Sequence, residues 1–173
     1  MHVYKSAVFA FVAFTLAALP VRAQDANTVE VTPYVAFGSV GVSPVGAAVT
    51  FPVASTLSVE TDVAYRRGEG NINAFSTNTS LLWFLPRVGQ ATPYLAGGVG
   101  LSQYGATVFS NDGSLIGVKS RVAMTVNAGG GLKMPVSDKL DLRTDARWFK
   151  SFGQQGSEQF RVAQGISFDV GKR

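Results

Sequence analysis

The sequence predicts an all-β fold, an eight-stranded antiparallel up-and-down barrel, and three observations lead to this prediction. Apolar and polar residues alternate with a period of two in one segment after another, whereas helical spacing of apolar residues is not found after the N-terminal region. Eight such segments follow one another, separated by Gly, Pro, Asn, Asp and Ser. The connections alternate between short turns headed by proline and longer polar segments, as expected when successive strands run up and down.

The N-terminal region is typical of a cleavable signal peptide. Lys5 precedes an apolar run of thirteen residues, 7–19, which is too short to cross a bilayer as a helix. Residues 21–23 then offer a small-residue cleavage site after Ala23. An uncleaved anchor helix is the alternative, but Pro20 ends the apolar run early. We therefore expect a signal peptide over residues 1–23 and a single domain over residues 24–173.

The alternation is clearest in residues 57–66, where Val59 and Val63 would face one side of a strand and Glu60 and Asp62 the other. A tilted strand needs about ten residues or more to cross an apolar membrane band of about 25 Å. The eight predicted strands cover approximately residues 29–37, 41–51, 56–66, 73–85, 92–104, 120–134, 139–149 and 158–170.

The charged residues of these strands fall on the face opposite to the apolar one. If the apolar face meets lipid, these charges point into the lumen, where eight strands leave room only for side chains, so acids and bases must pair. A soluble barrel with a solvated charged face would have the same charge pattern. The predicted lumen charge network comprises Glu60, Asp62, Arg66, Arg121, Lys133, Asp141, Arg143, Asp145, Arg147 and Arg161.

Aromatic residues gather near the strand ends, as in a barrel with one aromatic belt at each membrane interface. Packing in the core of a soluble β protein is the alternative explanation, because aromatics favour strands in general. One predicted belt, at the ends of the proline-headed turns, contains Phe51, Trp83, Tyr94 and Phe168. The other contains Phe37, Tyr65, Phe75, Tyr104, Trp148 and Phe160.

Two residues fit this scheme poorly. Tyr94 has the opposite parity to Leu95 and Val99, so its place in a belt requires a β-bulge in residues 92–104. Gln164 falls on the predicted lipid face near the middle of its strand.

The connections predict which end of the barrel lies on which side of the membrane. Short turns at residues 52–55, 86–90 and 135–138 begin with proline, and we place them in the periplasm with both termini. The longer polar connections would lie outside the cell. Residues 105–119 form the longest of these and carry Phe109. They are either the contact surface for an extracellular ligand or only a surface loop that tolerates sequence change.

The composition excludes several classes of function. Without the signal peptide, 13 basic residues remain against 11 acidic ones, and they are spread singly, so no nucleic-acid partner is expected. The chain has no cysteine, and its one histidine, His2, lies in the signal peptide. We therefore expect neither a disulfide nor a metal or cofactor site.

Three segments and the closing strand together resemble the small OmpA-like outer-membrane β-barrel domain family: residues 57–65, 93–100 and 127–133. The resemblance covers essentially the whole predicted domain. It implies a location in the bacterial outer membrane, contact with its lipid, and recognition by the barrel-insertion machinery, with the protein as a monomer. Many such barrels end on an aromatic residue, whereas here Phe168 is followed by five further residues.

The resemblance also bears on catalysis: small outer-membrane barrels that are enzymes need a histidine as general base, and the predicted domain has none. Serine–lysine chemistry at Lys119 and Ser120 stays formally open. We predict a non-catalytic barrel that anchors in the outer membrane and presents loops, for envelope structure or adhesion. The alternatives are a narrow, porin-like pore and a secreted lipocalin-like barrel, which would need an apolar interior.

Overall fold

The computed structural model describes residues 28–38, 44–67, 72–109, 115–153 and 156–170, and it places their side chains except at residues 72, 106–109 and 115–119. The predicted signal peptide, residues 1–23, lies outside the described residues. No helix in the described part of the chain is long and apolar enough to span a membrane.

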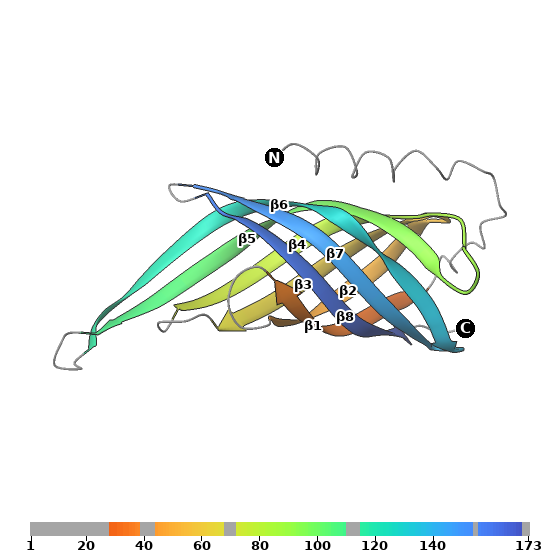
Figure 1. Cartoon of the computed structure of the whole chain (residues 1–173), viewed down its shortest axis with the longest axis horizontal. Helices are drawn as coiled ribbons and strands as arrows, with labels where there is room; N and C mark the ends of the chain where they lie inside the picture. Colours follow the sequence, from red (N-terminus) through yellow and green to blue (C-terminus); the bar gives the residue numbers. More distant parts are fainter. Residues whose placement is uncertain (1–27, 39–43, 68–71, 110–114, 154–155, 171–173) are drawn as a thin grey trace, which may run out of the picture.

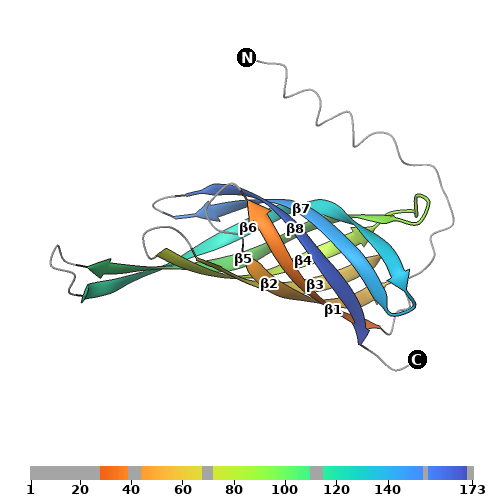
Figure 2. The ribbon, with the colours of Figure 1, turned by 60° about the horizontal axis from the view of Figure 1, so that its bottom comes forward.

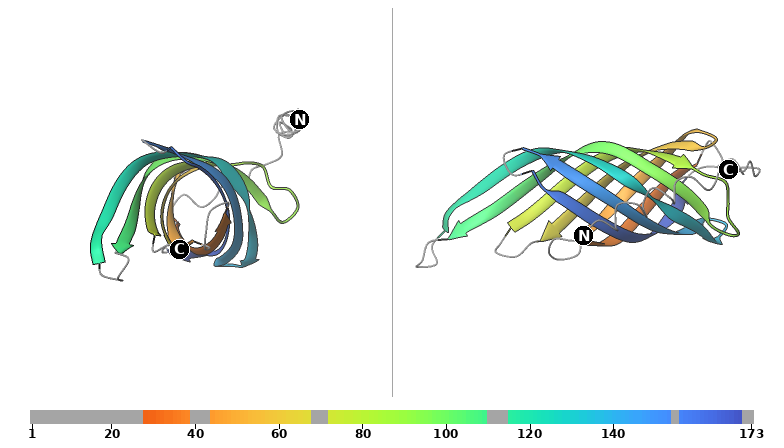
Figure 3. Two further views of the ribbon diagram at one scale, coloured as in Figure 1. Left: turned by 60° about the vertical axis from the view of Figure 1, so that its left-hand side comes forward. Right: turned by 45° about the horizontal axis from the view of Figure 1, so that its top comes forward.

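Eight strands form a closed antiparallel barrel, which confirms the predicted fold class (Figure 1). Each strand pairs with its neighbours in sequence, and the last pairs with the first, for example through Tyr34 and Gly165. Closure removes the sheet edges in the part of the barrel where all eight strands pair. The view along the barrel shows the ring that results (Figure 3, left). The strands are β1 (Val29–Gly38), β2 (Val45–Ala54), β3 (Leu57–Arg67), β4 (Ile72–Phe84), β5 (Thr92–Phe109), β6 (Leu115–Ser137), β7 (Leu140–Phe152) and β8 (Glu158–Val170).

The end of the barrel where β1 begins and β8 ends also carries the three short connections, β2–β3, β4–β5 and β6–β7. Two prolines that were predicted to head these turns lie instead within the last residues of their strands. The ladder shifts register directly after Pro52 and directly after Pro135. A β-bulge at a strand end tolerates the missing N–H of proline, so the strands extend past the predicted turn starts.

At the opposite end, β5 and β6 are the longest strands, and much of the predicted loop 105–119 is a paired hairpin. Gly105 lies opposite Ser120, and the ladder continues to Phe109 opposite Leu115. Figure 2 shows this hairpin projecting beyond the other strands. The glycine-rich, polar sequence of residues 105–119 indicates a loop. Two strands can nevertheless pair through backbone hydrogen bonds without the alternation of apolar and polar side chains on which strand prediction rests.

The barrel is apolar outside and charged inside. Valine, leucine and aromatic side chains dominate the outer face, and Val63, Leu81 and Val162 are among its exposed members. The inner face carries most of the buried polar groups, including Glu60 and Arg147, which are 2% and 1% exposed. A water-soluble protein distributes such groups the other way round, so this surface suits lipid.

Two aromatic belts lie on the outer face. At the hairpin end, the register places Tyr65 opposite Phe75 and Trp148 opposite Phe160. At the end of the short turns, Phe51, Trp83 and Phe168 are exposed.

The prediction that Tyr94 belongs to this second belt is wrong: Tyr94 is 2% exposed and points into the lumen. The ladder between β5 and β6 runs without a bulge from Thr92 to Val108. The alternation of side chains along β5 therefore directs Tyr94 to the inner face of the barrel. Tyr104 has the same parity, and its side chain lines the lumen where it opens at the hairpin end, which we call the mouth. Gln164 is exposed on the outer face, as its parity predicted.

Candidate functional site

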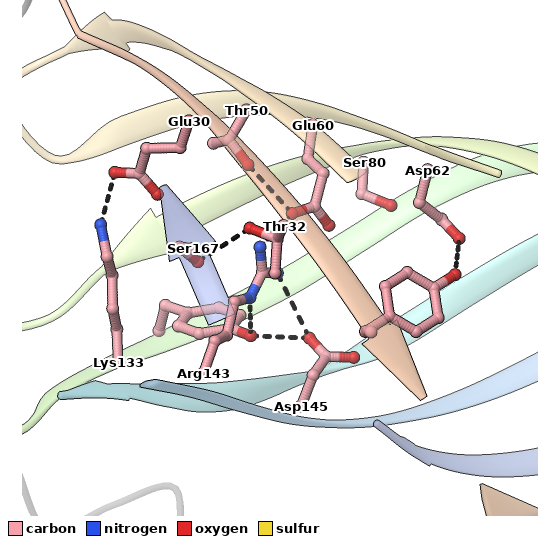
Figure 4. Close-up of polar contacts among 12 residues, drawn as sticks. Glu30, Thr32, Thr50, Glu60, Asp62, Ser80, Lys133, Arg143, Asp145 and Ser167 are labelled. Atoms are coloured by element: carbon pink, nitrogen blue, oxygen red, sulfur yellow. Dashed lines mark hydrogen bonds and ion pairs between the residues drawn. The ribbon is translucent and has the colours of Figure 1, made fainter. Parts of the chain in front are cut away.

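The centre of the lumen holds a cluster of buried ion pairs, the central ion cluster, formed by Glu60, Arg143, Asp145 and Arg147. Figure 4 labels Glu60, Arg143 and Asp145 of this cluster. Glu60 from β3 pairs with both arginines of β7, and its Oε1 lies 2.7 Å from Nη2 of Arg147. Nε of Arg147 lies 2.9 Å from Oδ1 of Asp145. Glu60 thus bridges two arginines on the far side of the barrel, and removing charges from water in this way requires such mutual pairing.

Uncharged polar groups extend this cluster across the lumen. The Thr50 hydroxyl donates to Glu60 Oε2 at 3.1 Å, and Arg147 Nη1 donates to Ser80 Oγ at 3.2 Å. The Ser80 hydroxyl in turn donates to Asn127 Oδ1 at 3.1 Å. The cluster therefore reaches five strands, β2, β3, β4, β6 and β7, and ties opposite walls of the barrel together.

Two tyrosines reach across a neighbouring strand to an aspartate on the strand beyond. The Tyr34 hydroxyl on β1 donates to Asp62 Oδ2 on β3 at 2.8 Å, passing Gly46 of β2. We call this group, with Arg161 of β8, the β1–β3 tyrosine site. Arg161 Nη1 donates to the Tyr34 oxygen at 3.1 Å and lies 3.2 Å from Asp62 Oδ2.

The β5–β7 tyrosine site repeats this arrangement with Tyr94, Gly131, Asp145 and Arg143. The Tyr94 hydroxyl donates to Asp145 Oδ2 at 2.7 Å, and Arg143 Nε donates to the Tyr94 oxygen at 2.8 Å. The Arg143 guanidinium also lies 4.9 Å from the centre of the Tyr94 ring. Because Arg143 and Asp145 belong to the central ion cluster, this site and that cluster are continuous.

Glycine is required under both rings. A Cβ atom on Gly46 would lie 2.5 Å from the Tyr34 hydroxyl, and one on Gly131 would lie 2.4 Å from the Tyr94 hydroxyl. Any larger residue would therefore displace the ring from the aspartate. Each site thus needs a tyrosine on one strand, a glycine directly opposite it on the next, and an aspartate one strand further.

A third group lies near the end of the short turns. Lys133 of β6 pairs with Glu30 of β1, and its Nζ lies 3.2 Å from Asp141 Oδ2 of β7. Close by, the hydroxyls of Thr32 and Ser167 are 2.8 Å apart (Figure 4). These contacts fill the lumen at this end.

The structure brings eight of the predicted lumen residues into these groups: Glu60, Asp62, Lys133, Asp141, Arg143, Asp145, Arg147 and Arg161. Arg66 lies at the mouth, where its Nη1 donates to Gln159. Arg121 differs from the prediction: it has the inward parity but is exposed, and it belongs to no ion pair among the described residues. The pairing of β6 with β7 begins only at Met124, so no β7 neighbour closes the lumen beside Arg121.

The lumen residues that were missed from sequence include one acid, Glu30, and two tyrosines, Tyr34 and Tyr94. Glu30 has the inward parity of β1 but lies in a short predicted strand without a clear pattern. Tyr34 was assigned no role, and Tyr94 was assigned to the membrane surface. A signal was present for the tyrosines, since Thr-Pro-Tyr-x-Ala occurs at residues 32–36 and again at 92–96.

Cavities interrupt the packing of the described lumen residues, and two of them lie beside these polar groups. The inner one, about 20 Å³, lies among Glu60, Asp62, Arg143 and their neighbours. A single water molecule needs about 10–15 Å³ of such space, so this cavity has room for about one. The second, about 70 Å³, lies at the hairpin end. Within the described residues, no group of three or more Asp, Glu, His or Cys side chains is placed to hold a metal ion.

No protein-family profile and no curated protein sequence matches this chain. Among solved structures, the fold is similar to the N-terminal β-barrel domain of Pseudomonas aeruginosa OprF, with a TM-score of 0.64, 15% identity, and coverage of 85% of this chain and 100% of that one. It is also similar to Neisserial surface protein A, with a TM-score of 0.67, 11% identity, and coverage of 84% and 98%. A major outer membrane protein from Thermus thermophilus matches with a TM-score of 0.62 and 11% identity over 82% and 99% of the two chains. At these identities the likeness shows the fold, an eight-stranded barrel of the kind found in outer-membrane proteins.

Proposed function

We propose that this protein is a non-catalytic β-barrel of the bacterial outer membrane, related to the small OmpA-like barrels. It anchors in the membrane as a monomer and presents the β5–β6 hairpin outside the cell, for envelope structure or adhesion. The observation that carries the proposal is the inverted distribution of side chains, apolar on the outside and ionic within. In this proposal a signal peptide over residues 1–23 directs export, and residues 24–173 form the barrel.

The outer face supports a membrane location for physical reasons. Lipid offers no hydrogen bonds, so a spanning sheet must satisfy its backbone internally, and a closed barrel does so. The aromatic belts lie at the two ends of the apolar band, where tyrosine and tryptophan rings suit the interface. The outer-membrane lipid and the barrel-insertion machinery are the partners that this location requires.

The described lumen favours an anchor over a pore or a ligand carrier. Side chains of the central ion cluster and both tyrosine sites cross it, and the inner cavity holds about one water. A narrow pore would need these ion pairs to separate. A lipocalin-like carrier would need an apolar interior, whereas Glu60, Asp62 and Arg147 are each 2% exposed or less.

The absence of catalysis rests on the sequence. Its one histidine is His2, which lies in the proposed signal peptide. At the Lys119–Ser120 pair, the Ser120 hydroxyl accepts a hydrogen bond from Gln103 Nε2 at 3.1 Å and is exposed. A nucleophilic serine is instead paired with a base in a protected site.

The projecting β5–β6 hairpin is the part of the proposed outer surface with the greatest reach (Figure 2). We assign the predicted ligand contact, residues 105–119, to this hairpin. Deleting residues 107–117 removes the outer part of both strands. It leaves untouched the closed part of the barrel, where β6 pairs with β7 from Met124 onward. If the hairpin is the contact surface, adhesion of cells that express the barrel falls while the level of folded protein is unchanged.

Lipid accessibility tests the proposal directly. The relaxation of spin labels at Val63 and Val162, on the outer face, should be accelerated by a lipid-soluble paramagnetic reagent. A label at the neighbouring inner position Ala64 should be protected from this reagent. The folded protein should fractionate with the outer membrane and migrate differently before and after boiling. Protection of the two valines from lipid would overturn the membrane assignment, and stable conductance steps in planar bilayers would favour the pore.

A further inference from the structure

The lumen widens at the hairpin end into a cavity of about 70 Å³, which we call the mouth cup. Residues from both halves of the barrel line it, including Arg66 of β3, Ser102 of β5, Ser151 of β7 and Arg161 of β8. Among the described residues that line the cup there are two arginines and no carboxylate. The described lining of the cup therefore offers two guanidinium groups and several hydroxyl groups.

Arg161 is held in place at the inner side of the cup. Its Nη1 contacts Asp62 and Tyr34, and its guanidinium lies 4.6 Å from the centre of the Phe149 ring. Its Nε is buried and has no hydrogen-bond acceptor in the described part of the chain. The Arg161 side chain as a whole is 11% exposed, so the part of it that lines the cup can meet a further oxygen acceptor.

Arg66 supplies the second charge, nearer the rim. It is half-buried, and its Nη1 donates to Oε1 of Gln159 at 3.3 Å. Asp62, which pairs with Arg161, lies below the cup and is not part of its lining. Positive charge therefore predominates among the described lining residues, in a recess where water screens it less than on an open surface.

The volume limits what can enter. At about 10–15 Å³ for a water-sized group, the cup holds about five such groups. That is room for acetate or inorganic phosphate. From charge, donors and volume together, we infer that the mouth cup binds a small free oxyanion, a carboxylate or a phosphate. A lipid headgroup is less suited, because the cup lies within the lumen and lipid meets the outer face.

Binding of two probes to the full-length barrel, folded in an uncharged glucoside detergent, tests this inference. Inorganic phosphate and acetate are titrated separately and followed by calorimetry. Arg66→Gln is expected to weaken binding about tenfold, since it removes a charge-assisted contact. Arg67→Gln is the matched control: it removes the same charge from the next residue of β3, which is exposed and does not line the cup.

Equal weakening by the two substitutions would reduce the effect to general electrostatic attraction and overturn the site. Failure of both probes to bind saturably would also overturn it. Arg161→Lys keeps a charge beside Asp62 but removes the planar guanidinium with its several donors, so it is expected to weaken binding. The difference in gel migration between boiled and unboiled protein should stay normal. Competition by phosphatidylglycerol mixed into the micelles would assign the cup to lipid headgroups instead. None of these outcomes depends on where the protein is located in the cell or on what its hairpin contacts.

Discussion

The two tyrosine sites lie four strands apart in an eight-stranded barrel and share one geometry, but their arginines have different surroundings. In the β5–β7 site, Arg143 and Asp145 belong to the central ion cluster, and the tyrosine is 2% exposed. In the β1–β3 site, Arg161 pairs with Asp62 alone and borders the mouth cup. The same side-chain device therefore holds the closed lumen together in one half of the barrel and presents a charge at its opening in the other.

The difference teaches how a small barrel combines stability with a functional surface. Arg143 and Arg147 each face two carboxylates in the closed lumen. Arg161 is fixed beside one carboxylate, Asp62, and also borders the opening of the lumen. Substitutions that lower the free energy of unfolding by different amounts at the two sites would sharpen this comparison.

The largest effect is expected for Glu60→Ala, because Glu60 pairs with both Arg143 and Arg147. Its removal leaves two buried arginines short of a partner, which should lower the free energy of unfolding by about 3–5 kcal/mol. Urea titration of the barrel in lipid vesicles, followed by tryptophan fluorescence, measures this loss.

Glu158→Ala is the control for Glu60→Ala. Glu158 pairs with Lys150 at the surface, where the two side chains are 60% and 44% exposed, and exposed pairs contribute little after screening by solvent. If the two alanine substitutions destabilised the barrel equally, the central ion cluster would have no special role in its stability.

Asparagine in place of each aspartate compares the two sites directly. Asp145→Asn removes a charge that faces two arginines and should cost about 3 kcal/mol. Asp62→Asn removes one that faces Arg161 alone, which is 11% exposed near the mouth, and should cost about 1–2 kcal/mol. Unfolding titrations of both variants in the same vesicles give the order, and the reverse order would contradict the distinction drawn between the sites.

The barrel itself was predictable from sequence because strand alternation has a period of two and the outer face of most strands is apolar. Residues 57–66 and 139–149, for example, reveal both faces without reference to any partner strand. Parity also placed Glu60, Asp145 and Arg147 in the lumen. Alternation gives the face of a residue, but it does not give the register between strands.

What depends on register was not predictable. Three strands must be aligned for Tyr34 to lie over Gly46 and meet Asp62. If the register of one strand shifted by one residue, each of its side chains would turn to the other face. Arg121 was misplaced for a related reason, since its exposure depends on where β7 stops pairing with β6. Tyr94 was misassigned because its aromatic character was given more weight than its parity.

The repeat of Thr-Pro-Tyr-x-Ala before both tyrosine sites, and of Thr-Asp at residues 61–62 and 144–145, suggests that the contacts formed by the two hydroxyls are equivalent. Tyr94→Phe and Tyr34→Phe each remove one hydroxyl that lies between an aspartate and an arginine, at a cost of about 1–2 kcal/mol. Tyr65→Phe, whose hydroxyl bonds Asn73 on the exposed outer face, is the control and should cost less. Double-mutant cycles of Tyr94 with Asp145 and of Tyr34 with Asp62 should then give similar coupling energies. Equal coupling together with unequal aspartate effects would locate the difference between the two sites in their arginines, whereas unequal coupling would mean that the tyrosine contacts themselves differ.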